Sequence, residues 1–308
     1  MAIPQEVIDL AEQRVQARIN KDFALSDQLR DQILSFGFII KDKPEGYELV
    51  EKPPFQVFEN LNSVKISKIV NKCRTTVCLI VDGWPEDTKE CLEALLKFCP
   101  SDSNILILDL GNIDAVGNYL AEVEKNEANL EIIHVSQTLI QTGWANSINK
   151  LIELSNSEYC VVMDLSSVFS GDAISPLLDR VKDQVVAVGW KGSLVNLDDE
   201  WRSVDDKGDG EVDILLGYLF VIKKDIAQEI PANPKAKFYR NADLEWSLDL
   251  RSKGHKLLAF SQDLPVTQKR HHGYHDSDIE YREKESKKTY DRILQNFRGK
   301  NQILSPRR

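Results

Sequence analysis

Three apolar runs in this 308-residue chain lead into an aspartate, and these carboxylates are the first candidates for chemistry. They are Asp82, Asp109 and Asp164, and Gly or Ser follows each within two residues. Carboxylate oxygens are the ligands that hard divalent cations prefer, and they also accept hydrogen bonds from the N–H groups of a bound molecule. One such aspartate is often only a turn former or a helix cap. Three at equivalent positions favour a binding site.

The elements around these aspartates repeat in a regular order from Thr75 onward. Strand-like runs alternate with helix-like patterns: 75–81, 104–110, 130–135 and 159–165 for strands, and 86–98, 115–125, 145–154 and 173–181 for helices. Continuous apolar runs between helices are typical of a mostly parallel sheet that helices cover on both faces. In such α/β folds ligands bind beyond the carboxyl ends of the strands. The sequence therefore predicts that the three aspartates meet in one crevice.

The known glycine-rich phosphate motifs are missing from the sequence. There is no dinucleotide fingerprint of the G-x-G-x-x-G kind and no phosphate loop that ends in Gly-Lys-Ser or Gly-Lys-Thr. The corresponding classes of nucleotide-binding protein lose support.

Residues 4–50 form a separate pattern. Apolar residues at helical spacing follow Pro4, a second helical pattern begins near Asp22, and Gly37 is a plausible end for it. Two short apolar runs around the turn 41–47 then predict a β-hairpin.

This N-terminal stretch resembles the helical hairpin at the C-terminal end of bacterial cysteinyl-tRNA synthetases. The resemblance rests on residues 17–49, with the order Arg18, Lys21-Asp22-Phe23-Ala24, Asp27, Arg30-Asp31 and the closing Asp42-x-Pro44-x-Gly46. In those enzymes the region lies in the part that binds tRNA. Residues 1–54 here carry seven Lys and Arg against ten Asp and Glu. Since phosphate contacts dominate nucleic-acid affinity, tRNA binding is not expected. Packing, a homo-oligomer or a protein partner through residues 1–54 is the favoured role.

The domain boundaries follow from these patterns. We expect the helical hairpin module at residues 1–54, a linker at 55–74 after Pro53-Pro54, a large α/β domain at 75–300 and a tail at 301–308.

The composition restricts the class of partner and the compartment. A net charge of −10 argues against a general binder of nucleic acid or acidic membranes. No apolar run approaches the length of a membrane span, and the N-terminus has no signal-peptide core. The five cysteines form no C-x-x-C pair, which favours buried thiols in a reducing cytoplasm. We therefore expect a cytoplasmic protein without a membrane span.

The large domain, from Val77 to Phe297, resembles the family 2 glycosyltransferases. Asp109, Gly111, Asn112 and Asp114 stand where that family has an Asp-x-Gly-Ser-x-Asp pattern. A Gly-x-Ala-x-x-x-Asn helix before an Asp-x-Asp strand is matched by Gly143, Ala145, Asn149 and Asp164, and Asp243 stands at the later Glu-Asp pair. The order and spacing of these motifs are more specific than any one of them. The resemblance implies the GT-A nucleotide-sugar-binding fold.

The resemblance also implies a reaction and roles for residues. Such an enzyme moves a sugar from a nucleotide-diphosphate donor to an acceptor hydroxyl. Asp109, with Asp82 beside it, would bind the base of the donor, while Gly143, Asn149 and Asp164 would belong to the nucleotide-sugar site. Asp164 would hold a divalent cation, Mn²⁺ or Mg²⁺, against the diphosphate. Asp243 would be the general base of an inverting reaction, and its place in the first turn of a helix would favour the ionised form.

Two positions depart from the family pattern. Ser166 stands where the second aspartate of the Asp-x-Asp motif is expected, and Ala242 replaces the Glu before the later Asp. A neutral hydroxyl is a weak ligand, so less charge is available to hold a cation.

A histidine-rich segment supplies other candidate ligands. His271, His272, His275 and Asp276 lie within six residues, after Lys269 and Arg270. His272 is the preferred single metal ligand, and the two cations could hold a diphosphate. A solvated polar loop is the competing interpretation.

The acidic stretch 198–213 is interpreted as a lid on the acceptor side. A calcium loop is rejected, because Lys207 and Leu216 occupy positions that need oxygen ligands. Trp201 in this stretch could stack on a sugar or simply pack.

Three functions therefore stay open at this stage. The leading one is an inverting nucleotide-sugar transferase with an unknown acceptor. The second is a catalytically impaired, transferase-like domain that binds a nucleotide-sugar or a protein partner. The third, an RNA-linked protein, has the acidic charge against it.

Overall fold

The computed structural model describes residues 3–69, 71–111 and 113–306. The chain divides into two compact units, one up to Gln56 and one from Val57 onward. No helix in the described part of the chain combines the length and the apolar character needed to cross a membrane. Asn112, one of the motif positions above, lies outside the described residues, and the side chain of Asp114 is not described.

The smaller unit is a helical hairpin followed by a β-hairpin, as predicted. Its elements are α1 (Gln5–Ile19), α2 (Phe23–Ser35), β1 (Phe38–Lys43) and β2 (Gly46–Glu51). Asp22 caps α2 by accepting a hydrogen bond from the Leu25 backbone N–H at 3.0 Å. The guanidinium of Arg14 donates to both carboxylate oxygens of Asp42, at 2.7 and 3.2 Å, and so ties α1 to the β-hairpin.

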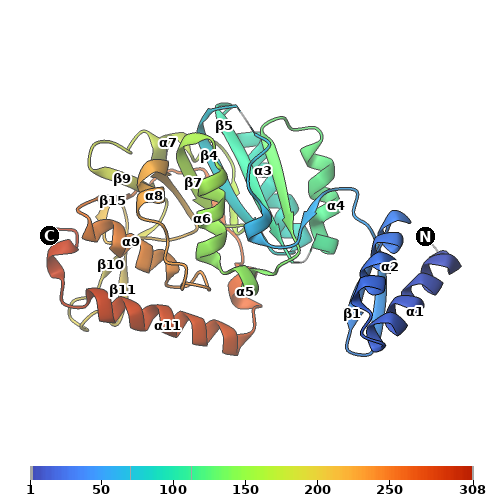
Figure 1. The fold of residues 1–308 in the computed structure, drawn as a ribbon. Coiled ribbons are helices and arrows are strands. Elements are labelled where there is room, and N and C mark those ends of the chain that lie inside the picture. Colours follow the sequence, from blue (N-terminus) through green and yellow to red (C-terminus); the bar gives the residue numbers. More distant parts are fainter. Residues whose placement is uncertain (1–2, 70, 112, 307–308) are drawn as a thin grey trace. The chain divides into compact units, whose positions relative to one another are not determined.

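The larger unit is built on a mixed sheet (Figure 1). Nine strands belong to it in the described residues, in the order β12, β15, β9, β14, β7, β4, β5, β6, β3. In chain order their bounds are Val57–Phe58 (β3), Cys73–Val81 (β4), Ser103–Leu110 (β5), Leu130–Val135 (β6), Ser157–Met163 (β7), Val185–Gly189 (β9), Gly210–Val212 (β12), Leu219–Lys223 (β14) and Lys256–Ala259 (β15). The run from β3 to β7 is parallel, and β14 is antiparallel to both of its neighbours. The predicted α/β class with a mostly parallel sheet is confirmed. Part of the segment expected as a linker forms β3 at the edge of this sheet.

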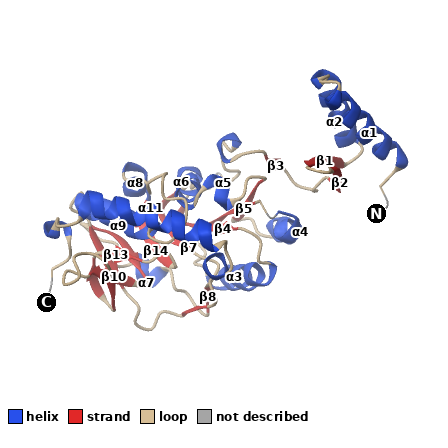
Figure 2. Cartoon of the chain, turned by 90° about the horizontal axis from the view of Figure 1, so that it is seen from below, coloured by secondary structure: helices blue, strands red, loops and turns tan. Residues whose placement is uncertain are grey.

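Burial of the strands on both faces explains their apolar runs. Every residue of β5 is buried, and alternate residues of β4 enter different cores. Val77 and Leu79 pack with α3 (Pro85–Phe98) and α4 (Ile113–Glu124), whereas Cys78 packs with α6 (Trp144–Leu154). Figure 2 shows α6 and α8 (Lys224–Glu229) on one side of β4 and β7, and α3 on the other. The parallel strands therefore end at one edge between two helical layers.

The C-terminal half adds the elements beside that edge. Strands β10 (Gly192–Val195), β11 (Val204–Lys207) and β13 (Ile214–Leu215) form a small sheet, and β8 (Ser167–Phe169) pairs with β16 (Val266–Gln268). Its helices are α9 (Ala242–Ser252), α10 (His272–His275) and α11 (Ile279–Phe297), with short turns at α7 (Ser175–Leu178) and η2 (Asn301–Ile303). Two further short turns, η1 (Leu61–Ser63) and α5 (Leu139–Thr142), belong to the first half of the chain. The acidic stretch 198–213, interpreted above as a lid, instead carries β11 and β12, each hydrogen-bonded to a neighbouring strand.

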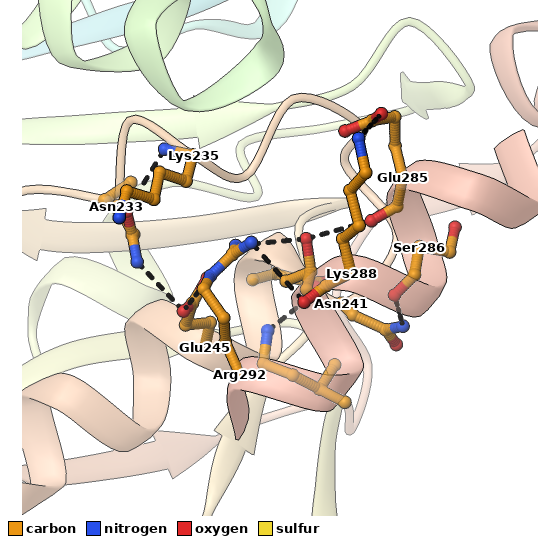
Figure 3. A network of polar contacts seen from close by, with 12 residues as sticks. Asn233, Lys235, Asn241, Glu245, Glu285, Ser286, Lys288 and Arg292 are labelled. Carbon is orange, nitrogen blue, oxygen red and sulfur yellow. Dashed lines mark hydrogen bonds and ion pairs between the residues drawn. The ribbon is translucent and has the colours of Figure 1, made fainter. Parts of the chain in front are cut away.

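A polar network fastens α11 to α9 (Figure 3). Arg292 on α11 donates from Nε and Nη2 to the two carboxylate oxygens of Glu245, at 2.9 and 2.7 Å. Asn233 donates to the same carboxylate at 2.9 Å, and Asn241 donates to the Ser286 carbonyl at 3.0 Å. Glu245 is 1% exposed, so its charge is compensated by these donors inside the protein. The network fixes the start of α9, which carries Asp243.

Candidate active site

A cleft of about 1200 Å³ lies at the carboxyl ends of the parallel strands. Asp82 reaches it from the end of β4 and Asp164 from the end of β7, while Asp243 reaches it from the first turn of α9. His271 and His272 border the same cleft from the segment that follows β16. Residues far apart in the sequence are thus brought together where α/β folds bind ligands.

Asp164 and His271 form a direct pair. Nε2 of His271 lies 2.8 Å from Oδ2 of Asp164, and the backbone N–H of Ser166 donates to Oδ1 at 2.8 Å. Burial raises the pKa of Asp164, but the hydrogen bonds from His271 and Ser166 outweigh it and hold the pKa below its ordinary value. The His271 ring accepts a hydrogen bond at Nδ1 from the Tyr274 backbone N–H at 3.1 Å, so its proton lies on Nε2, toward Asp164.

His272, the ligand preferred from the sequence, points elsewhere. Its Nδ1 lies 2.6 Å from Asp276 Oδ2, and its Nε2 lies 3.2 Å from Asp87 Oδ2. Its ring stacks on Trp84 with centroids 4.8 Å apart. Both ring nitrogens therefore face carboxylates other than Asp164.

The two cations before the histidines are also engaged. Lys269 pairs with Glu90 at 2.9 Å and Arg270 with Asp276 at 2.8 Å. The hydrogen bonds from Arg270 and His272 lower the pKa of Asp276 to about 2. The segment is thus tied to α3 and to itself rather than extending freely into solvent.

Asp243 is a buried carboxylate at the cleft. It is 8% exposed, and its Oδ2 accepts a hydrogen bond from the Gly217 backbone N–H at 3.0 Å. Its Oδ1 accepts from the Leu244 backbone N–H at 2.9 Å. Burial raises the pKa of Asp243 to about 6, although these backbone donors act in the opposite direction. A carboxylate with a pKa near neutral can both take up and release a proton under physiological conditions.

Gly143 has a backbone role at the start of α6. Its φ is +81°, and a side chain there would place a Cβ 3.2 Å from the Cα of Lys237. Glycine is the residue that adopts this conformation without strain and admits the neighbouring chain. The next residue, Trp144, lines the cleft.

Three predicted donor-binding residues do not line this cleft: Gly143, described above, Asp109 and Asn149. Asp109 is fully buried within β5, where its Oδ2 lies 2.7 Å from Nδ1 of His134 on β6. Asn149 donates to the Ala232 carbonyl at 2.7 Å and accepts from the Ala232 N–H at 3.0 Å, which ties α6 to the segment before α9. Their role in donor binding stays a prediction, and the bonds described are structural ones.

The two departures from the family pattern are buried. Ser166 is 3% exposed and Ala242 is 1% exposed, and neither contributes a charge. In the part of the chain that the structure describes, no group of three or more His, Cys, Asp or Glu side chains is arranged to hold a metal ion.

Two further residues beside the cleft were not found from the sequence. The Tyr239 ring stacks on His271 with centroids 4.3 Å apart, and burial raises the pKa of its hydroxyl. Lys191 contacts Gln268 Oε1, and its Nζ lies 4.4 Å from the Trp190 ring. Burial lowers the pKa of Lys191. Neither belongs to a spaced motif; folding places Tyr239 in the lining of the cleft and Lys191 against Gln268, which lines it.

Comparison with solved structures supports the fold. The structure of GalNAc-T7 with UDP, GalNAc and Mn²⁺ matches with a TM-score of 0.56 and 14% identity, over 73% of this chain and 48% of that chain. A mannosyltransferase from Pyrobaculum calidifontis in complex with GDP-Man and Mn²⁺ gives a TM-score of 0.46 at 14% identity, over 69% and 62% of the two chains. The first of these likenesses agrees with the expected GT-A fold.

A short part of the chain is similar to cysteine–tRNA ligases. It is 49% identical over 45 residues to the enzyme of Caldicellulosiruptor saccharolyticus, which is 15% of this chain and 10% of that protein. It is 52% identical over 44 residues to the enzyme of Bacillus pumilus, which is 14% of this chain and 9% of that protein. The chain thus spans about a tenth of the length of these curated relatives. The resemblance of the hairpin module is confirmed as a partial one.

The larger unit carries the broader match. The family model described as "Glycosyl transferase family 2" covers residues 78–237, which include the ends of the strands that deliver Asp82 and Asp164 to the cleft. This stretch is more than half of the chain. On this match, and with the fold and cleft described above, the protein belongs to glycosyl transferase family 2.

Proposed function

We propose that the protein transfers a sugar from a nucleotide-diphosphate donor to an acceptor hydroxyl, with inversion at the anomeric carbon and Asp243 as the general base. The acceptor oxygen forms the new bond to the anomeric carbon as its proton passes to Asp243. The bond from that carbon to the diphosphate breaks, and the leaving group keeps the electron pair. The proposal rests on Asp243, a buried carboxylate of pKa about 6 that shares a cleft with Asp164.

A divalent cation, Mn²⁺ or Mg²⁺, fits this cleft through a small set of protein ligands. Asp164 supplies a carboxylate, and His271, whose Nε2 lies 2.8 Å from it, supplies the nearest second donor. Mg²⁺ is commonly held by one or two protein groups together with substrate phosphates, so the diphosphate would complete the coordination. We place His271 here instead of His272, because both nitrogens of His272 face Asp87 and Asp276. The cation would neutralise charge on the departing diphosphate.

His271 sets a condition on such binding. Its Nδ1 accepts the Tyr274 N–H, which leaves the proton on Nε2. Coordination through Nε2 therefore requires the proton to leave that nitrogen and the Tyr274 contact to open. With Ser166 in place of a second carboxylate, we expect cation binding to be weak before the donor is bound.

Donor binding without turnover is the second candidate, and the neutral Ser166 and Ala242 are the observations in its favour. A titration of the full chain with nucleoside diphosphate sugars, with and without Mn²⁺, tests both candidates. We expect micromolar binding that Mn²⁺ strengthens, and release of the nucleoside diphosphate once a suitable acceptor is supplied. Binding without release over an extended acceptor panel would favour the second candidate, and no binding of any donor would contradict both.

A further inference from the structure

The cleft continues from Asp243 into a groove between α9, α11 and the small sheet. Its walls are formed by Leu244 of α9, Leu216 after β13, Val204 of β11 and Tyr290 of α11. Val204 is 37% exposed, and the other three are half-buried. Leu248 and Ile293 lie at the bottom and are 1% and 4% exposed. An apolar wall of this kind is open to a ligand at its rim and packed at its base.

The face that α11 turns to the groove changes in polarity along the helix. Glu283, Lys287, Tyr290 and Ile293 border the cleft at helical spacing. The ten helical steps from Glu283 to Ile293 span roughly 15 Å at 1.5 Å per step. The face of α11 is therefore charged at one end of the groove and apolar at the other.

The polar atoms of Tyr290 and Trp201, at the apolar end, are engaged within the protein. The Tyr290 hydroxyl donates to the Trp201 carbonyl at 2.9 Å, and Trp201 Nε1 donates to Asn301 Oδ1 at 3.4 Å. The Trp201 ring is 5% exposed and packs with Val195 and Ile293, so stacking on a sugar is not open to it. Arg202 and Ser203, both exposed, also line the cleft beside Val204, so this end has apolar walls with polar side chains at its rim.

The turn that holds Trp201 is strained. Glu200 and Trp201 have φ values of 61° and 74°, a left-handed conformation that non-glycine residues rarely adopt in succession. The contacts of Trp201 with Tyr290 and Asn301 keep the turn in this form. The shape of the groove is thus maintained by the fold.

We propose that the acceptor is an amphiphile, with its hydroxyl at Asp243 and an apolar chain along the groove between α9, α11 and β11. The inference rests on the proposed function, because it takes Asp243 as the group that receives the acceptor's proton. Continuity between this groove and the cleft that holds Asp243 and Asp164 is the observation behind it. The apolar chain would cover Val204 and Leu216, which water now contacts.

Binding of n-alkyl β-D-glucosides to the full chain, below their micelle concentrations, tests this proposal. Glucose and the hexyl, octyl and decyl glucosides are compared by calorimetry. We expect affinity to rise by about fourfold for each added methylene until the groove is filled. Equal affinity for glucose and for decyl glucoside would overturn the proposal without any variant being made.

Two variants locate the binding. Val204→Asp places a charge on the groove wall and is expected to remove the dependence on chain length. Ile66→Asp is the matched control, since Ile66 is 82% exposed and does not border the cleft. Chain-length dependence that survives Val204→Asp, or that Ile66→Asp removes equally, would overturn the proposal. Donor binding is measured separately on the same proteins. If the wild type binds no nucleotide-sugar donor, that result counts against the proposed function alone.

Discussion

Asp243 is a carboxylate on which opposing effects act. The first turn of α9 and the N–H groups of Gly217 and Leu244 stabilise its ionised form, as the sequence suggested for a helix start. Burial acts against the charge and is the larger effect, so the pKa rises to about 6. The carboxylate is still largely ionised at neutral pH, and a base needs that form.

Ser166→Asp tests where the cation is held. The new carboxylate would lie beside Asp164 and add the charge that hard cations favour. Calorimetric titration with Mn²⁺ alone should show affinity rising on the order of tenfold. Ser170→Asp is the matched control, because it adds the same charge at an exposed position outside the cleft. Unchanged Mn²⁺ affinity in Ser166→Asp would place the cation elsewhere.

At the scale of single residues, the sequence predicted which residue types form the site better than it predicted where each side chain points. Asp82 and Asp164 directly follow their strands and reach the cleft. Asp109 lies inside β5, where the strand register pairs it with His134 of β6. The sequence alone does not show which residues of neighbouring strands lie opposite each other. The sequence could not decide between His271 and His272 for a similar reason, since the side chains of these neighbouring residues point in different directions.

Among the elements, the contact of α11 with α9 is the one that supports the proposed base. Glu245→Ala removes the acceptor of Asn233 and of Arg292 Nε, and leaves Arg292 Nη2 with only the Thr289 hydroxyl at 3.2 Å. Breaking a buried pair of this kind costs roughly 3 kcal/mol, so the melting temperature of the larger unit should fall by several degrees.

Lys125→Met is the control for that substitution. It breaks the Lys125–Glu122 pair, whose side chains are 66% and 68% exposed, and surface pairs contribute little. Differential scanning calorimetry compares the two variants with the wild type. Equal melting temperatures for the wild type and Glu245→Ala would mean that the network does not hold α11 in place.

The sequence predicted the positions of the strands closely where the strands are buried on both faces. Strands β4, β5, β6 and β7 match the predicted apolar runs, because strands buried on both faces need such runs. The acidic stretch 198–213 was misjudged, because β11 and β12 are stabilised by backbone pairing with β10 and β15. The pairing of β12 with β15, more than 40 residues later, leaves little trace in local composition.

For the whole molecule, the open question is what the N-terminal unit binds. Its resemblance to part of cysteine–tRNA ligases raises tRNA as a partner, whereas residues 1–54 carry three more acidic than basic side chains, ten against seven. We expect no submicromolar binding of unfractionated bacterial tRNA at physiological salt, by filter binding or fluorescence anisotropy. A protein partner or a second copy of the chain stays the proposed use of this unit. Submicromolar tRNA binding that disappears when residues 1–56 are deleted would contradict this prediction.

The dependence of turnover on pH tests the central claim, that Asp243 is the base of a sugar transfer. Asp243 can accept the acceptor's proton only when ionised, so the turnover rate should fall as the pH falls through about 6. Asp243→Asn should lower turnover by about 100-fold or more and remove this step, while donor affinity stays near that of the wild type. Asp249→Asn is the control, because Asp249 lies on the same helix, also has a pKa raised to about 6 by burial and does not border the cleft. The account predicts a wild-type profile for Asp249→Asn; an unchanged profile and rate in Asp243→Asn would contradict it.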